Sequence, residues 1–332
     1  MMLPANHPPV AAPNVGVLLV NLGTPDAPDT AAVRRYLAEF LSDRRVVEIP
    51  PLVWKPILHG IILRTRPVKS AANYAKVWMD EGSPLAVYTN RQAAALQSRL
   101  GSAADVRVAM RYGQPAIASQ LSAMKADGCN RILVAPLYPQ YSGATTATVI
   151  DEVGRALAAM RWQPALRTLP AYHDDPAHIA ALAATLNAEL AKLDFEPEAI
   201  VASFHGMPER TLHLGDPYHC HCQKTARLLS EALGKPLTIA FQSRFGRAKW
   251  LEPSTEDTIK RLANEGKKKI AIFAPGFSAD CLETLEELAM QGKEQFEEAG
   301  GEHYAYLPCL NDSEPGMDML EALVRRELSG WL

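Results

Sequence analysis

The sequence predicts an α/β protein whose strands form parallel sheets. Seven short runs rich in β-branched and other apolar residues have the length and composition of strands, and they span residues 16–23, 105–113, 131–139, 199–206, 237–243, 268–275 and 303–308. Their apolar residues are continuous rather than alternating, which is typical of parallel sheets buried on both faces. Segments with apolar residues at three- and four-residue spacing lie between the strands and predict the covering helices.

Several of these helices are well defined by their periodicity. They span residues 30–41, 91–100, 146–160, 225–233 and 284–296. A further helix is expected after Pro253, because Ser254 and Asp257 have the spacing of a capping pair at its start.

The predicted strands fall on both sides of segment 161–175, which contains two prolines and a tyrosine. We therefore expect two similar α/β halves, each with its own sheet. The N-terminal domain is expected over residues 14–165 and the C-terminal domain over residues 166–332, after a disordered segment at residues 1–13.

Composition excludes several classes of protein. The chain has 332 residues, enough for roughly two domains of about 150 residues each. Its net charge is -3, so nucleic acid is not an expected partner. No apolar run approaches the roughly 18 residues that span a bilayer, and residues 1–13 lack the features of a secretory signal. Five cysteines, an odd number, fit a reduced cytoplasmic protein better than a disulfide scaffold.

The residues that follow the strands are the first candidates for a site, because ligands of such sheets bind beyond the carboxyl ends of the strands. None of these segments matches the glycine-rich patterns that bind dinucleotides or nucleoside triphosphates. The chain also has no GxSxG, HExxH or CxxC motif. The unusual strand-end segments are residues 22–26, 138–146, 203–210, 241–246 and 275–283.

Ionisable residues in two of these segments are candidates for chemistry. His205 directly follows a strand, where a histidine acts as a base or metal ligand, or else is a hydrogen-bonded turn residue. Asp280, Glu283 and Glu287 are spaced to share one face of a helix, which periodicity alone predicts to be solvated. Glu283 nevertheless falls near the expected crevice, whereas Glu286 is expected to point elsewhere on the helix.

Aromatic and soft-ligand residues admit two interpretations each. Residues 219–222 (HCHC) are weak evidence for a metal, because adjacent residues rarely converge on one tetrahedral ion. Five aromatic residues near the strand ends suit either the core or a flat hydrophobic ligand, and they are Tyr138, Tyr141, Phe204, Trp250 and Phe277.

Segment 50–67 (PPLVWKPILHGIILRTRP) is apolar, punctuated by prolines and ends in Arg64 and Arg66. On pattern alone we favour a loop and short helix packed on the core. The alternative is an exposed apolar lip around a hydrophobic ligand, or a contact with a membrane surface.

Read together, the strand-end motifs resemble those of the ferrochelatases from about residue 15 to the C-terminus. The resemblance is carried by LVNLGTPD (19–26), LYPQYSGATT (137–146), SFHGMPER (203–210), GDPY (215–218), FQSRFGxxxWLxP (241–253) and PGFSADCLETLEEL (275–288). It implies two Rossmann-like domains that hold a porphyrin between them, and insertion of Fe²⁺ into that porphyrin. Cys281 departs from the histidine that the family often has there.

The resemblance also implies roles for particular residues. His205 and Glu283 match the catalytic pair that contacts iron and handles the pyrrole protons, and Asp280 and Glu287 match acids proposed to relay metal or protons. Segment 50–67 corresponds to the active-site lip. The expected porphyrin-binding residues are Leu22, Arg66, Tyr74, Ser83, Tyr138, Ser142, Trp250 and Phe277.

The expected function is therefore ferrochelatase activity with protoporphyrin IX, Fe²⁺ being a substrate and no cofactor being bound permanently. A coproporphyrin ferrochelatase and a non-catalytic porphyrin or heme carrier of the same fold remain alternatives. No iron–sulfur cluster is expected, because such a cluster needs four converging cysteines and those of this chain are scattered. Peripheral contact with a membrane surface through residues 50–67 remains open as the alternative to core packing.

Overall fold

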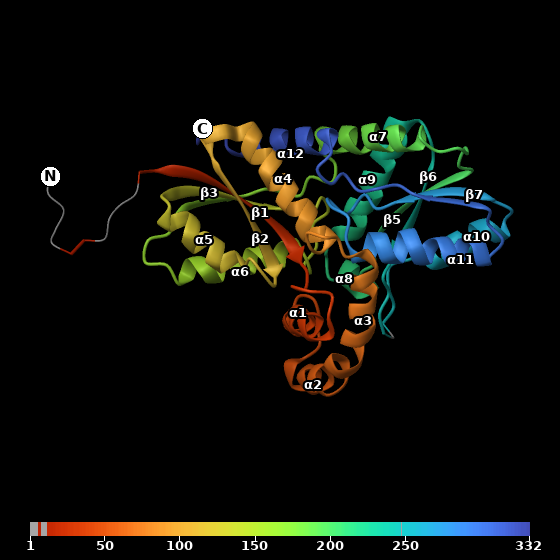
Figure 1. Cartoon of the computed structure of the whole chain (residues 1–332), viewed down its shortest axis with the longest axis horizontal. Coiled ribbons are helices and arrows are strands. Elements are labelled where there is room, and N and C mark those ends of the chain that lie inside the picture. The colour runs from red at the N-terminus through yellow and green to blue at the C-terminus, as the bar shows by residue number, and fades with distance from the viewer. Residues whose placement is uncertain (1–5, 8–11, 247) are drawn as a thin grey trace.

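The computed structural model describes residues 6–7, 12–246 and 248–332. The segment expected to be disordered, residues 1–13, thus lies for the most part outside the described residues. The chain folds into two parallel sheets flanked by helices, with a helical projection below the first sheet (Figure 1). The predicted α/β class with a sheet in each half is confirmed.

The first sheet has the strand order β2-β1-β3-β4 and is parallel throughout. Its strands are β1 (Asn14–Gly23), β2 (Asp105–Tyr112), β3 (Cys129–Pro136) and β4 (Ala165–Thr168). Strand β4 is a short edge strand without a fully buried residue, so it lacks the apolar run by which the others are recognised. Since β4 pairs with β3, the first sheet continues past residue 165, where we expected the first domain to end.

The second sheet has the order β6-β5-β7-β8 and is also parallel. It consists of β5 (Ala199–His205), β6 (Leu237–Gln242), β7 (Lys269–Phe273) and β8 (His303–Tyr306). All four strands lie within one or two residues of the segments that the sequence predicts.

Helices cover both sheets. The first sheet is flanked by α4 (Pro84–Leu100), the 3₁₀ turn η2 (Gly101–Ala103), α5 (Ile117–Ala126) and α6 (Thr146–Ala158). The second is flanked by α8 (Glu209–His213), α9 (Tyr218–Leu233), α10 (Thr255–Asn264), the π-helix η3 (Glu283–Gly292) and α11 (Lys293–Glu298). The predicted cap is confirmed, because Ser254 is the N-cap of α10 and its hydroxyl accepts from Asp257 N at 3.1 Å.

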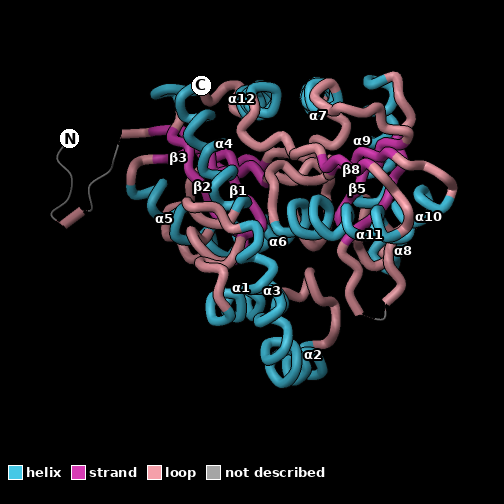
Figure 2. Tube along the Cα trace, turned by 45° about the vertical axis from the view of Figure 1, so that its right-hand side comes forward, coloured by secondary structure: helices cyan, strands magenta, loops and turns pink. Residues whose placement is uncertain are grey.

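Two helices join the halves. Helices α7 (Pro176–Leu190) and α12 (Glu314–Glu327) lie side by side across the top of the molecule (Figures 1 and 2). Although α12 is near the C-terminus, it packs against α4 and β3 of the first half. Arg99 of α4 binds three acids of α12, Glu314 at 2.5 Å, Asp318 at 2.6 Å and Glu321 at 3.3 Å. One apolar core consequently runs through both halves, so the two sheets are held rigidly together.

The projection consists of α1 (Thr30–Ser42), α2 (Pro51–Ile57), the π-turn η1 (Leu58–Ile62) and α3 (Leu63–Val77). The segment expected to be a lip, residues 50–67, is helical here. Its inner side is core, since Leu58 is fully buried, and Trp54 donates its indole N–H to Leu41 O at 2.6 Å. Its outer side is apolar but open, Leu52 being 93% and Ile61 58% exposed. The interpretation as a helix packed on the core therefore describes the inner side of the segment, and the interpretation as an exposed apolar lip describes its outer side.

Candidate active site

His205 ends strand β5, where hydrogen bonds hold both its backbone and its ring. Its backbone carbonyl accepts from the Tyr218 hydroxyl at 3.0 Å. Its ring Nδ1 lies 2.7 Å from Gly206 O. A carbonyl oxygen only accepts hydrogen bonds, so Nδ1 carries the proton and Nε2 presents a lone pair. An imidazole in this tautomer can accept a proton or bind a cation at Nε2.

Gly206 brings strand β6 and Trp250 against the histidine. Its N–H donates to Gln242 O at 2.7 Å. A Cβ on Gly206 would lie 2.5 Å from that same carbonyl oxygen and 3.3 Å from Cε3 of Trp250. Glycine is required at this position because any side chain would push the two segments apart.

Glu283 is placed near His205 through Gln242. In the sheet register Gln242 lies beside His205, and its side-chain amide donates to the backbone carbonyl of Glu283 at 2.9 Å. Ser203 orients that amide by donating to Gln242 Oε1 at 2.7 Å. The ring of Phe277 lies 6.4 Å from the ring of His205. Strand β5, strand β6 and the start of η3 therefore converge at one end of the second sheet.

Glu287 follows Glu283 on η3 and is largely buried. Burial and then the negative charge of Glu283 raise the pKa of Glu287 to about 7. Ser243 donates a short hydrogen bond to its carboxylate. Ser243 has a φ of 62°, a left-handed conformation that non-glycine residues seldom adopt and that is frequent at functional sites. Glu287 can thus hold a proton or release it near neutral pH.

Asp280 does not share the open face of these glutamates. It precedes η3, is 3% exposed, and its carboxylate accepts three hydrogen bonds. The donors are Tyr306 at 2.5 Å, Asn311 at 2.6 Å and Thr284 at 2.9 Å. The prediction that Asp280, Glu283 and Glu287 form one solvated helix face is wrong, because the helix is a π-helix whose start is buried against β8.

The lip helix α3 reaches over this end of the second sheet. The guanidinium carbon of Arg66 lies 4.3 Å from the centre of the Phe245 ring. Phe245 packs edge-on against Trp250, with ring centres 6.1 Å apart. Burial and then the charge of Glu283 hold the pKa of Tyr74 well above its ordinary value. Arg66 and Tyr74 of α3 thus lie within range of the Glu283 charge, and Trp250 is joined to Arg66 through the Phe245 ring.

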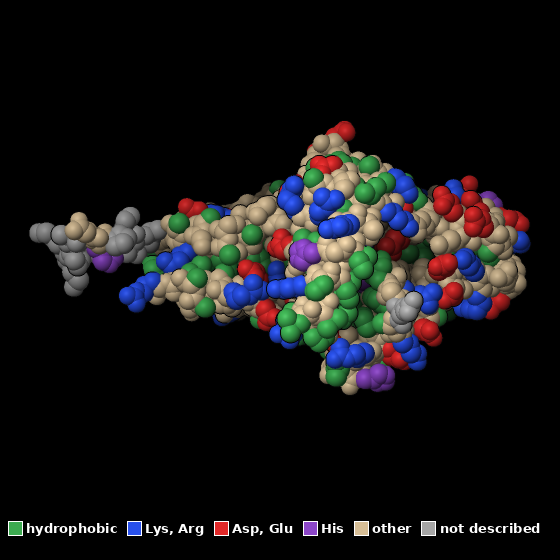
Figure 3. Space-filling view, turned by 90° about the horizontal axis from the view of Figure 1, so that it is seen from below, with side chains coloured by type: hydrophobic (Ala, Val, Ile, Leu, Met, Phe, Trp, Pro, Cys, Tyr) green, Lys and Arg blue, Asp and Glu red, His purple; other side chains and the backbone are tan. Residues whose placement is uncertain are grey.

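The space-filling surface is hollowed at this place. Figure 3 shows hydrophobic side chains gathered around a hollow on the lower face of the molecule, with acidic side chains inside it. Leu22, at the end of β1, packs with the lip residues on the first half's side of the projection.

Two of the remaining expected porphyrin residues, Ser142 and Ser83, are buried in the scaffold. Ser142 is fully buried, and its hydroxyl donates to Asp216 at 3.3 Å. Ser83 is 2% exposed and is the N-cap of α4, accepting from Ala86 N at 3.3 Å. Tyr138 is partly buried, and its enclosed hydroxyl has no hydrogen-bond partner among the residues that the structure describes. In this structure Ser83 and Ser142 hold loops in place and present no hydroxyl to a ligand.

Sequence reasoning missed several residues that build the site. Gln242, Ser243 and Phe245 lie within FQSRFG, which was noted as a strand-end segment without a role for these side chains. Tyr36 lies on α1, and the charges of Tyr74 and Glu283 add to burial in raising its pKa. Its helical periodicity is that of an ordinary core residue, so no sequence signal marks it.

Residues 219–222 lie at the start of α9 and diverge. The ring of His221 stacks on that of His173, 3.6 Å away, while Cys222 is fully buried and Cys220 is exposed. Within the described ranges, no three His, Cys, Asp or Glu side chains are grouped so as to hold a metal ion.

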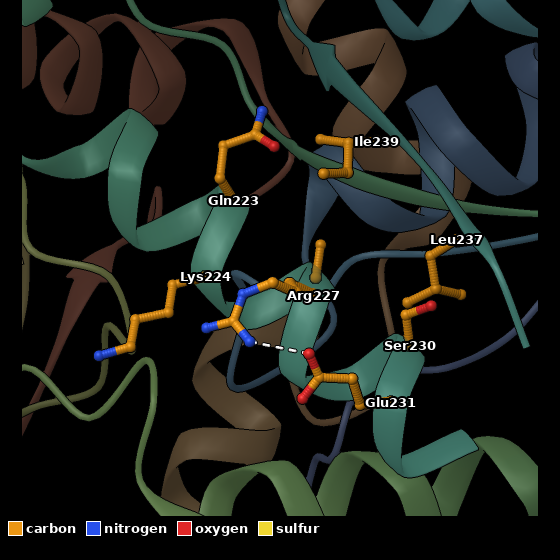
Figure 4. A pocket seen from close by; sticks show the side chains of 8 residues that line it. Gln223, Lys224, Arg227, Ser230, Glu231, Leu237 and Ile239 are labelled. Carbon is orange, nitrogen blue, oxygen red and sulfur yellow. Dashed lines mark hydrogen bonds and ion pairs between the residues drawn. The ribbon is translucent and has the colours of Figure 1, made fainter. Parts of the chain in front are cut away.

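A separate pocket of about 490 Å³ lies between α9 and β6 (Figure 4). Its cations are already paired, Arg227 with Glu231 at 2.8 Å and Lys224 with Asp174. It borders Leu237 at the amino end of β6, opposite the end that carries Gln242. This position is not where ligands of parallel sheets bind.

Two solved structures share this architecture over nearly the whole chain. SirB from Bacillus subtilis, solved with Fe³⁺, superimposes with a TM-score of 0.59 at 11% identity, covering 96% of this chain and 98% of its own. The sirohydrochlorin chelatase SirB from Bacillus subtilis subspecies spizizenii, in complex with cobalt, gives a TM-score of 0.56 at 10% identity, covering 96% of each chain. The chain therefore has the chelatase fold, two Rossmann-like domains.

Comparison with related sequences identifies the family within this fold. A model of the ferrochelatase family matches residues 14–328. The ferrochelatase of Rhizobium meliloti (strain 1021) is 57% identical over 98% of both chains. The ferrochelatase of Agrobacterium fabrum (strain C58) is 55% identical over 99% of this chain and 98% of its own. This chain belongs to the ferrochelatase family, as its motifs predicted.

Proposed function

We propose that this protein inserts Fe²⁺ into protoporphyrin IX, giving protoheme and two protons. The observation that carries the proposal is the family match over residues 14–328. The convergence of His205, Glu283 and Glu287 at one end of the second sheet supports it. Insertion requires that two pyrrole N–H protons leave before the ring nitrogens bind the metal.

His205 is proposed as the first proton acceptor. Its Nδ1–H is held by Gly206 O, so Nε2 is the basic atom that faces a substrate. A base in position typically accelerates such proton transfers by about 10²–10⁴-fold. The Tyr218 hydroxyl and the β5–β6 register keep the ring from moving away, because both fix the backbone of His205.

Glu283 and Glu287 are proposed to supply negative charge and a second proton acceptor. A histidine and a carboxylate form a weaker metal site than a closed cage of four ligands, so Fe²⁺ can pass from them to the porphyrin. Glu287, with a pKa of about 7, can take up or release a proton at physiological pH. Asp280 holds the start of η3 through its three hydrogen bonds rather than relaying a proton in this conformation.

The porphyrin is proposed to lie in the hollow between the lip and the second sheet. Trp250, Phe277 and Leu22 offer apolar surface to a flat ring, and the Arg66 guanidinium suits a propionate. The outer face of the lip exposes Leu52 at 93%. With the exposed cations around it, this face is proposed to contact a membrane surface, which would supply a hydrophobic porphyrin.

No helix among the described residues is both long enough and apolar enough to cross a membrane. All five cysteines are free thiols, which supports the proposed cytoplasmic location. Cys129 lies on β3 and Cys220 and Cys222 lie on α9, whereas Cys281 and Cys309 lie outside the helices and strands. No three of these thiols are grouped among the described residues, which supports the proposal that no iron–sulfur cluster is bound.

Anaerobic incubation with Fe²⁺ and porphyrin tests the proposal. Protoporphyrin IX and coproporphyrin are supplied in separate reactions, and metalloporphyrin absorption is followed. Faster insertion into protoporphyrin IX is expected. Faster insertion into coproporphyrin would assign coproporphyrin as the substrate. Binding of porphyrin without insertion of Fe²⁺ would identify the protein as a porphyrin carrier.

A further inference from the structure

Glu286 is a buried carboxylate that the proposed reaction does not use. It is 1% exposed, whereas Glu283 and Glu287 on the same helix are partly exposed. Removing a charged side chain from water is costly unless it is paired. Its partners are Lys76 Nζ at 2.8 Å and the side-chain amide of Gln291, which lies 3.0 and 2.8 Å from the two carboxylate oxygens. The carboxylate is therefore fully engaged, and by residues of two different elements.

The bonds between Gln291 and Glu286 depend on the π-helix. Five residues correspond to about 500° of rotation in an α-helix with about 3.6 residues per turn, which places residues i and i+5 about 140° apart. A π-helix closes i→i+5 turns, so residues five apart lie about one turn above one another. The amide of Gln291 reaches both oxygens of Glu286 only in the π register. These bonds accordingly stabilise that register over the α-helical one.

The other partner of Glu286, Lys76, links η3 to the lip. Lys76 belongs to the last turn of α3, the helix that also carries Arg66 and Tyr74. Helices α3 and η3 pack together, and the Lys76 ammonium group forms an ion pair with Glu286 across this contact. Lys76 is half exposed, so its long side chain reaches from the surface to a carboxylate beneath it.

We propose that Glu286 is a positioning residue that holds η3 in the π register and, through Lys76, fixes η3 against the lip helix. The proposal rests on the roles proposed above for Glu283 and Glu287, whose relative orientation the π register sets. In an α-helix the same two glutamates would be rotated with respect to each other and to His205. The hollow would remain, but its acids would no longer converge on the porphyrin centre.

Three variants test this, each removing one part of the cluster with little change in size: Gln291→Met, Lys76→Met and Glu286→Gln. Lys293→Met is the matched control. Lys293 directly follows η3, is half exposed, and forms a surface ion pair in which its Nζ lies 3.8 Å from a carboxylate oxygen of Glu297. Fe²⁺ insertion is measured at a temperature at which each variant is fully folded. We expect kcat to fall about tenfold or more in the three variants, as for residues that orient metal-binding side chains.

Other readouts separate positioning from stability. The dissociation constant for protoporphyrin IX, from fluorescence quenching, should change less than about twofold, because the apolar walls remain. Lys76→Arg should restore most of kcat. The losses of Lys76→Met and Gln291→Met should be less than additive, because both act through Glu286. A crystal structure of Gln291→Met should show residues 283–292 at least partly α-helical.

An unchanged kcat in all three variants, or a π-helix retained in Gln291→Met with reduced activity, would overturn the proposal. Loss of activity in step with loss of folded protein would also overturn it. Failure of the proposed function gives a different result, because the natural protein and the Lys293→Met control would then both fail to insert Fe²⁺.

Discussion

The acid that faces the hollow should make the protein less stable as the pH rises. The ordinary pKa of a glutamate is 4.5, whereas burial and the charge of Glu283 raise the pKa of Glu287 to about 7. Between these two values the folded protein keeps a proton that the unfolded chain has released, so folding becomes less favourable as the pH rises through this window. Each pKa unit corresponds to about 1.4 kcal/mol, so the difference of about 2.5 units costs about 3 kcal/mol above pH 7.

Glu287→Gln removes this cost, because glutamine stays neutral and can still accept the hydrogen bond from Ser243. We expect the variant and the natural protein to have similar free energies of unfolding near pH 4.5. By pH 8 the variant should be more stable by up to about 3 kcal/mol. The assay is urea unfolding of the metal-free protein at pH 5, 6, 7 and 8, followed by circular dichroism.

Glu298→Gln is the matched control, since Glu298 is an exposed glutamate on the neighbouring helix α11. Its difference from the natural protein should stay within about 0.5 kcal/mol at every pH. A stability difference for Glu287→Gln that does not vary with pH would refute the reasoning. So would a difference that favours the natural protein at pH 8, because the carboxylate would then be stabilised by its surroundings.

Three further predictions concern the other parts of the site. His205→Ala should lower insertion by about 10²–10⁴-fold while porphyrin binding persists. His213→Ala, which changes an exposed histidine, should have no effect on insertion. Half of the natural activity in His205→Ala would mean that His205 is only a turn residue. Replacing Ile57 and Ile61 with serine should raise the KM for porphyrin without lowering the melting temperature, whereas a large stability loss with unchanged KM would assign both to the core. Protein purified anaerobically should contain no iron–sulfur cluster by visible absorption and elemental analysis; stoichiometric iron and sulfide, lost in Cys220→Ser, would contradict this.

Local chemistry explains what the sequence predicted well. The strands are continuous apolar runs, so seven of them are recognisable within two residues at each end, or three at the end of β3. Ser254 caps α10 as its spacing indicates. His205 stands at a strand end because the apolar run of β5 stops there. In a parallel sheet, a residue at the carboxyl end of a strand lies near the edge at which ligands bind.

The sequence was least informative where residues far apart meet. Strand β4 has no buried side chain to mark it, and α12 covers the first half from the far end of the chain. Asp280 and Ser142 are residues of types that often have catalytic or binding roles. Both are buried here and form hydrogen bonds with other segments of the chain. A helix period alone could not show this, because burial depends on which neighbours the fold supplies.

By itself, the sequence determined the α/β class, seven of the eight strands among the described residues, the family and the residue types at the strand ends. Tertiary structure alone decided which of those residues face the hollow. The pairing of Lys76 with Glu286, 210 residues later, is the clearest case. A glutamate that is solvated on an isolated helix becomes a buried ion pair here, because folding removes water and leaves one cation within reach.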